Sequence, residues 1–131
     1  MQQFASALKA RSRLLSRPDH LANRFKGRNA ALVLATTVMI MMMENAALNA
    51  IKPYLDEGES AVGTHVDVVH QAATPEGLRV TASAEVTNID GQRIDFRIEA
   101  TDGTQVVGTG THERRVINLA KFSERLKRTG N

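Results

Sequence analysis

Residues 78–103 read LRVTASAEVTNIDGQRIDFRIEATDG, and apolar and polar side chains alternate on both sides of the first Asp-Gly pair in this stretch. Successive strand side chains point to opposite faces of a sheet, so the alternation predicts two strands, residues 78–89 and 92–101. The Asp90-Gly91 pair between them is typical of a two-residue hairpin turn. The stretch therefore predicts an antiparallel β-hairpin with one apolar face.

Two further strands are expected on either side of this hairpin. Residues 104–117 alternate after a second Asp-Gly pair, and residues 62–70 read VGTHVDVVH. Strands joined by short turns pair with their neighbours in the chain, so we expect a meander in chain order. Within 62–70, Val66, Val68 and His70 share the apolar face. Burial there would shift the pKa of His70, as acid–base chemistry requires, although a hydrogen-bonded core histidine is the plainer alternative.

The segment before these strands has a different character. Residues 37–52 are apolar around most of the helix circumference, which is typical of a buried helix. Thr36 or Thr37 is suited to cap its first turn, and Pro53 ends it. The most apolar stretch is about 14 residues long, whereas a membrane span needs roughly 20. We therefore expect a core helix that carries one ionisable group, Glu44.

The first 29 residues differ from the rest in charge. They carry seven basic side chains and one acidic side chain, a net +6, whereas residues 30–131 carry ten basic and thirteen acidic groups, a net −3. We expect weak helix over residues 4–15, an interruption at Pro18 and a loop over residues 23–29. The chain is thus divided into a basic N-terminal extension, residues 1–29, and a domain, residues 30–131. A solvated extension is favoured over a transit peptide or a segment that binds nucleic acid or membrane.

The composition excludes several classes of function. There is no cysteine, which excludes disulfides, thiolate nucleophiles and zinc–cysteine sites. Aromatic residues make up 4% of the chain, too few for the stacking platform that single-stranded nucleic acid needs. His65, Asp67 and His70 lie on two different strand faces, so no metal site is expected. His65 and His112 are expected at the surface or at an interface. We expect no cofactor, no nucleic-acid or membrane partner and, without an apolar signal segment, a cytoplasmic location.

Together these elements predict an α+β domain of two layers, with the helix laid across the apolar face of the sheet and a short helix over residues 119–128. This packing would bring Glu44 towards His70, with the Thr36 hydroxyl at the start of the helix as a third group. A carboxylate can orient an imidazole or act as a base, and a hydroxyl can position water or a substrate carbonyl. The three side chains are the candidate catalytic residues.

Five segments resemble a known family in order and spacing. They are Val33–Thr36, Met43–Ala47, Val62–Val66, His70–Pro75 and Gly110–Arg114. Over residues 32–125 the chain resembles the fluoroacetyl-CoA thioesterase-like family of hot-dog proteins. The resemblance implies a hot-dog fold, in which a curved antiparallel sheet wraps around one long central helix. It also implies a homodimer or higher homo-oligomer with its sites at the subunit interface.

On this resemblance Thr36, Glu44 and His70 are the catalytic residues. Gly63 would lie beside the substrate, where its backbone N–H could help to hold the thioester oxygen. The implied reaction is hydrolysis of an acyl-CoA thioester to the free acid and CoA. Glu44 and His70 would activate water or support a transient acyl-enzyme, with Thr36 aiding alignment, and both routes stay open.

Some features set this chain apart from the family pattern. Residues 1–29 do not read as the strand that usually precedes the helix, and Thr37 stands where many members have proline. No aromatic residue among 27–30 matches the lid associated with fluoroacetyl selectivity, so we do not carry that selectivity over and expect a short or polar acyl group. The alternative function is a non-catalytic hot-dog module that binds an acyl or CoA-like ligand or acts as a dimerisation scaffold.

Overall fold

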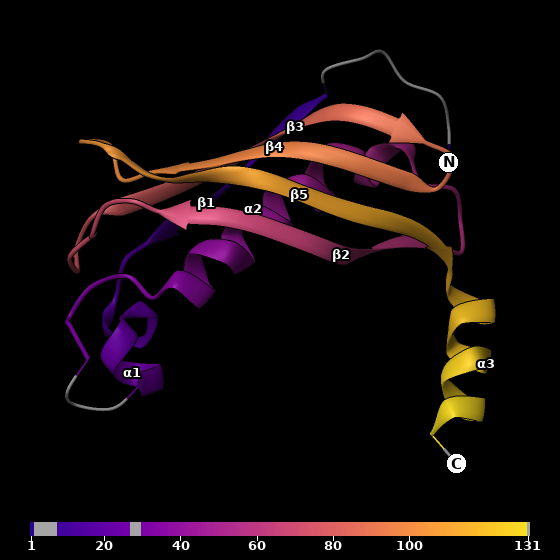
Figure 1. Cartoon of the computed structure of the whole chain (residues 1–131), viewed down its shortest axis with the longest axis horizontal. Coiled ribbons are helices and arrows are strands. Elements are labelled where there is room, and N and C mark those ends of the chain that lie inside the picture. The colour runs from indigo at the N-terminus through magenta and orange to yellow at the C-terminus, as the bar shows by residue number, and fades with distance from the viewer. Residues whose placement is uncertain (2–7, 27–29, 131) are drawn as a thin grey trace.

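A computed structural model of the protein describes residues 1, 8–26 and 30–130, and in these residues one curved sheet packs against one long helix. The strands are β1 (Lys9–Leu15), β2 (Glu59–His70), β3 (Arg79–Asp90), β4 (Arg93–Thr101) and β5 (Val106–Asn118). The helices are η1 (Pro18–His20), α1 (Ala22–Lys26), α2 (Thr36–Ile51), η2 (Lys52–Tyr54) and α3 (Leu119–Thr129). Figure 1 shows the sheet curving over α2, with α1 and α3 at opposite ends of the molecule. The α+β prediction and the hot-dog arrangement are confirmed.

The strand order in the sheet is β1-β3-β4-β5-β2, and every pair is antiparallel. β3, β4 and β5 form the expected meander, and Gly91 in the first turn has φ of 61°, a value that favours glycine. The prediction that all strands follow chain order is wrong for β2, which pairs with β5. The segment between β2 and β3 is longer than a hairpin turn needs, so the chain can cross the sheet. β1 and β2 are therefore its two edges.

Strand β1 corrects the helix expected over residues 4–15. It pairs with β3 from Lys9 opposite Glu85 to Leu15 opposite Arg79. Residues 4–7 lie outside the described residues. The loop expected over residues 23–29 is likewise wrong where α1 lies, and residues 27–29 lie outside the described part of the chain. The division of the chain at residue 29 stays a prediction.

Helix α2 supplies the centre of the core, as predicted. Its buried side chains are Val38, Met39, Met42, Met43, Ala46, Ala47, Ala50 and Ile51. Full burial of a side chain of the size of methionine stabilises a fold by about 1.5–3 kcal/mol. The residue at the N-cap is Ala35, and no side chain caps the helix, so the expected threonine cap is wrong. Among the described residues, no helix combines the length and the apolar character needed to cross a membrane.

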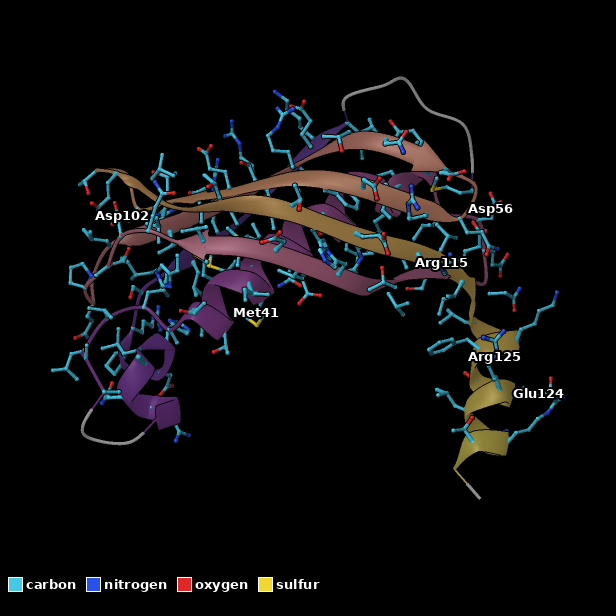
Figure 2. The ribbon with its side chains drawn as sticks, viewed as in Figure 1. Met41, Asp56, Asp102, Arg115, Glu124 and Arg125 are labelled. Atoms are coloured by element: carbon cyan, nitrogen blue, oxygen red, sulfur yellow. The ribbon has the colours of Figure 1, made fainter. Side chains whose placement is uncertain are left out.

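The turn between β4 and β5 holds a buried carboxylate, Asp102, which is 4% exposed and lies at one end of the sheet (Figure 2). Its Oδ2 accepts hydrogen bonds from Thr74 Oγ1 at 2.9 Å and from Gln105 Nε2 at 3.2 Å. Its Oδ1 accepts from the backbone N–H of Thr104 at 3.0 Å. Burial raises the pKa of Asp102, but the hydrogen bonds from Thr104, Thr74 and Gln105 outweigh it and lower the pKa to about 2.

This carboxylate links the turn to the segment that follows β2. Thr74, which it binds, accepts a backbone hydrogen bond from Leu34 N at 2.8 Å, just before α2 begins. Gln105 Nε2 also donates to the carbonyl of Ala73 at 3.0 Å. Asp102 therefore helps to fix the end of β2 relative to the start of α2, the two places from which His70 and Thr36 project.

We predict that Asp102→Asn lowers the free energy of unfolding by about 1–3 kcal/mol at neutral pH, because an amide nitrogen leaves buried donors without an acceptor. The folded pKa, about 2, lies below the unfolded value of roughly 3.9. The charge therefore stabilises the fold above about pH 4, and this contribution is lost as the pH falls towards 2. Thermal melting should show the gap between the variant and the wild type narrowing over that range. A difference in melting temperature that does not change with pH would show that the charge of Asp102 is not the source of the stabilisation.

A second prediction concerns β1, whose removal would expose an edge of β3 and one side of α2. A chain starting at Ser16 should melt at a much lower temperature, and less cooperatively, than a chain starting at Lys9. The longer truncation removes β1 and the shorter one keeps it, so the pair isolates the strand. Equal melting of the two chains would instead support a separable N-terminal extension.

Candidate active site

Thr36 and His70 meet where α2 begins and β2 ends. Thr36 Oγ1 lies 2.7 Å from His70 Nδ1, a hydrogen-bond distance. The two side chains line a cavity of about 290 Å³, together with Val33, Leu34 and the segment Gln71–Ala73. The hydroxyl that was expected to cap the helix therefore contacts the imidazole instead. A hydroxyl next to a histidine is the arrangement of a nucleophile and its general base.

His70 is held in the form that can accept a proton. Its partial burial lowers its pKa from the usual 6.5, and the backbone of Ala72 opposes this to a smaller extent. The other ring nitrogen, Nε2, is buried and has no hydrogen-bond partner among the described residues. With its proton on Nε2, the neutral ring presents Nδ1 as an acceptor to the Thr36 hydroxyl.

Glu44 and Gly63 form a second group, farther along α2 and β2. A Cβ atom built on Gly63 would lie 2.6 Å from Glu44 Oε2 and 3.3 Å from His112 Cε1. Glycine thus leaves the room that the carboxylate occupies. The Oε2 atom of Glu44 also lies 3.6 Å from Arg114 Nη1, which makes an ion pair. The Glu44 side chain is 39% exposed, whereas that of Arg114 is only 9% exposed, so the carboxylate is the part of this group that faces solvent.

Arg114 is fixed by neighbours on the inner side of the sheet. Its Nη2 donates to the carbonyl of Ala61 at 2.7 Å, and its Nη1 lies 3.3 Å from His112 Nε2. His112 Nδ1 lies 2.7 Å from the carbonyl of His65, and the ring stacks on Phe96 with centroids 5.8 Å apart. Burial lowers the pKa of His112, with the backbone of His65 opposing, which favours a neutral ring that donates to His65 and accepts from Arg114. The arginine is therefore held in one orientation.

The expectation that His112 lies at the surface is wrong, because it is 2% exposed. Sequence reasoning also assigned no part to Arg114. The alternation of β5, counted back from the buried Val116, places Arg114 and His112 on the same inward face. This alternation could have predicted from the sequence that both side chains face inward. It was overlooked because the two residues are polar or charged and follow two glycines. His65, by contrast, is exposed as predicted.

The structure of one chain brings Thr36 and His70 together but keeps Glu44 and Gly63 apart from them. Glu44 follows Thr36 by eight helical residues, a rise of about 12 Å along the axis. Gly63 precedes His70 by seven strand residues, or roughly 20 Å. Among the described residues His70 has no hydrogen bond to Glu44. The four predicted site residues therefore form two half-sites.

Comparison with known proteins places this geometry in a family. The sequence profile of the family described as fluoroacetyl-CoA-specific thioesterase matches residues 17–120. The fluoroacetyl-CoA thioesterase of Streptantibioticus cattleyicolor is 46% identical over 95 residues, which cover 72% of this chain and 68% of that protein.

Solved structures agree with the sequence match. A variant of the fluoroacetyl-CoA-specific thioesterase FlK, in complex with fluoroacetate and CoA, superposes with a TM-score of 0.85 at 37% identity, covering 91% of this chain and 99% of that one. A thioesterase superfamily member from Thermus thermophilus superposes with a TM-score of 0.93 at 27% identity, covering 99% and 96%. The chain therefore belongs to the fluoroacetyl-CoA-specific thioesterase family, and it is an acyl-CoA thioester hydrolase with a hot-dog fold.

Proposed function

We propose that the protein hydrolyses short or polar acyl-CoA thioesters, with Thr36, His70 and Glu44 as catalytic residues and Gly63 beside the substrate. The observation that carries this proposal is the 2.7 Å contact between the Thr36 hydroxyl and the His70 imidazole at the edge of a cavity. It supports chemistry at the carbonyl carbon of a thioester, which needs a nucleophile and a base in direct contact.

The contact favours Thr36 as the nucleophile. Thr36 Oγ1 adds to the thioester carbonyl while its proton passes to His70 Nδ1. Collapse of the tetrahedral intermediate breaks the carbon–sulfur bond, and the imidazolium returns the proton to the departing CoA thiolate. Water then adds to the threonine ester with His70 again as base, which releases the acid and restores the hydroxyl. Direct attack by a water molecule activated by Glu44 and His70 is the second route.

The surroundings of Glu44 favour a short or polar acyl group. Its carboxylate, the Arg114 guanidinium and the bare backbone of Gly63 lie together. A long alkyl chain placed there would desolvate these charged groups without replacing their hydrogen bonds, which is costly. A small acyl group, or one with a polar substituent, avoids that cost. The structural relative that binds fluoroacetate and CoA is consistent with a substrate of this size.

We further propose that the protein is a homodimer whose site lies at the subunit interface. β2 is a 12-residue edge strand with an open side, and natural proteins usually pair or cover such edges. Large apolar side chains are exposed on this strand, at Val69, and on the segment that leads into and forms α2, at Leu32 and Met41. Figure 2 shows Met41 on the part of α2 that the sheet leaves uncovered. A second copy of this chain would bury these groups.

Pairing of the two β2 strands would also join the half-sites. In an antiparallel pair, Gly63 can face the partner subunit's His70 only if His70 also faces the partner subunit's Gly63. Because the β-bulge between Gly63 and His65 adds one residue to this span, the two-fold axis then passes through Asp67, and each Thr36–His70 pair meets Glu44 and Gly63 from the other chain. We place this dimer in the cytoplasm, where acyl-CoA thioesters are formed and consumed.

We predict that His70→Ala and Thr36→Ala each lower kcat by roughly 10²-fold or more with little change in folding, since each removes one member of the proton-transfer pair. Because the pKa of His70 is lowered, the loss of kcat/KM on the acid side of the pH profile should begin below pH 6.5. Release of CoA from a panel of acetyl-, fluoroacetyl- and long-chain acyl-CoA thioesters measures both. Thr36→Ser should retain much of the activity and form an acyl-enzyme visible by mass spectrometry. Wild-type turnover in both alanine variants would remove the pair from the mechanism.

Subunit mixing tests the interfacial site. Glu44→Gln and His70→Ala chains are each nearly inactive in this proposal, but their heterodimer holds one site with both residues intact. Random reassociation of equal amounts should therefore recover about a quarter of wild-type activity. Light scattering on the same samples gives the oligomeric state. If the mixture stays inactive although mass spectrometry detects heterodimers, the two residues do not act across the interface.

A further inference from the structure

A second cavity lies where β5 runs into α3, apart from the Thr36–His70 cavity. Its volume is about 240 Å³. The side chains around it are Gln92, Arg115, Val116, Ile117, Asn118, Lys121, Phe122 and Arg125. Figure 2 shows Arg115 near the end of β5 and Arg125 on α3 beyond it, so the cavity is built by two elements that meet at an angle.

The charges around this cavity are all positive. Arg115, Lys121 and Arg125 line it, and no carboxylate does. In the part of the chain that the structure describes, none of these three takes part in an ion pair, whereas Arg93 and Arg128 nearby are paired with Asp95 and Glu124. Three cations thus converge on one hollow without a counter-charge.

Another basic hollow of the surface differs in this respect. It lies beside β1 and is lined by Lys9, Arg11 and Arg13, but also by Glu99. Lys9 is moreover neutralised by Glu85 at 2.9 Å. Unlike that hollow, the cavity at α3 keeps its positive charge available for an external anion.

We infer that the cavity at α3 binds phosphate groups, and specifically those of the 3′-phosphoadenosine end of the CoA substrate. Two guanidinium groups and an ammonium are the donors that bind phosphate best, because charge-assisted hydrogen bonds to phosphate oxygens are short and strong. Asn118 Oδ1 already accepts from Lys121 N at 3.0 Å, which leaves the amide nitrogen of Asn118 as an additional donor. Phe122 offers an aromatic surface for the adenine ring.

The register of the sheet relates this cavity to the proposed active site. Arg115 is opposite Val62 in the β2–β5 pairing, and Arg114 is opposite Gly63. The two arginines point to opposite faces of the sheet, one to the cavity at α3 and the other to Glu44. The cavity therefore lies at the same end of the sheet as Glu44 and Gly63, and the long pantetheine arm of CoA would span the distance. This inference rests on the proposed function, since it assigns a subsite for the same substrate.

The test compares Lys121→Gln/Arg125→Gln with Lys127→Gln/Arg128→Gln, a double variant of the same helix with the same change in charge at positions that do not line the cavity. The first should raise KM for an acyl-CoA roughly tenfold or more, with kcat unchanged, because it removes charge-assisted contacts to the phosphates. The second should leave KM near the wild-type value. Hydrolysis of the matching acyl-pantetheine, which has no nucleotide, should be unaffected by either change.

Calorimetry separates this inference from the proposed function. The wild-type protein should bind 3′-phosphoadenosine 5′-phosphate more tightly than ATP or inorganic phosphate, and the Lys121→Gln/Arg125→Gln variant should lose that binding. Equal binding of ATP would overturn the CoA assignment, as would an unchanged KM in that variant while acyl-CoA is still hydrolysed. An absence of acyl-CoA hydrolysis by the wild type, with retained binding of the nucleotide, would instead contradict the proposed function alone.

Discussion

The burial of α2 under the curved sheet is the constraint on which the rest of the structure depends. Its small residues Ala46, Ala47 and Ala50 allow close approach to the strands, and its methionines fill the remaining space with flexible side chains. Gly108 on β5 serves the same packing, because a Cβ atom there would lie 2.6 Å from the sulfur of Met39. A helix held in this way cannot slide or rotate. Thr36 at its start and Glu44 two turns later are therefore fixed in space by the core itself.

The polar groups of the site are positioned by this apolar framework and by a few buried hydrogen bonds. At one end, Asp102 and Thr74 fix the chain on both sides of the Thr36–His70 contact. At the other end, His112 and Ala61 orient Arg114 against Glu44. In each case a buried group is held by several hydrogen bonds or an ion pair, which makes its position costly to change. Rigid placement of this kind is what a reaction between a hydroxyl, an imidazole and a thioester requires.

Much of the fold could be predicted because its signals are local. The alternation around Asp90-Gly91 and the apolar helix are properties of short stretches, and so was the position of His70 on the inner face of β2. Sequence patterns did not predict β1, because its inward residues Ala10, Ser12 and Leu14 are only partly apolar. Three of its outward residues, Lys9, Arg11 and Arg13, are basic, as suits an edge strand. The pairing of β2 with β5 joins strands that are distant in the sequence, and no local sequence pattern predicts which distant strands pair. The same holds for Thr36 and His70. The sequence indicated both residues, but their direct contact at 2.7 Å depends on how the helix and the strand pack in the folded chain.

The separation of the half-sites has a consequence for how the enzyme can work. Side-chain motion cannot close a gap of about 12 Å between the start of α2 and Glu44, because a glutamate side chain spans only a fraction of that length and the helix is fixed in the core. Within one chain, then, Glu44 either takes no part in the chemistry at His70 or acts on the site of another chain. The open edge of β2 and the exposed apolar side chains of Val69, Leu32 and Met41 favour the second possibility. Under the proposed function, catalysis would then depend on assembly, since a monomer would keep the Thr36–His70 pair but lack Glu44 and Gly63 of the other chain.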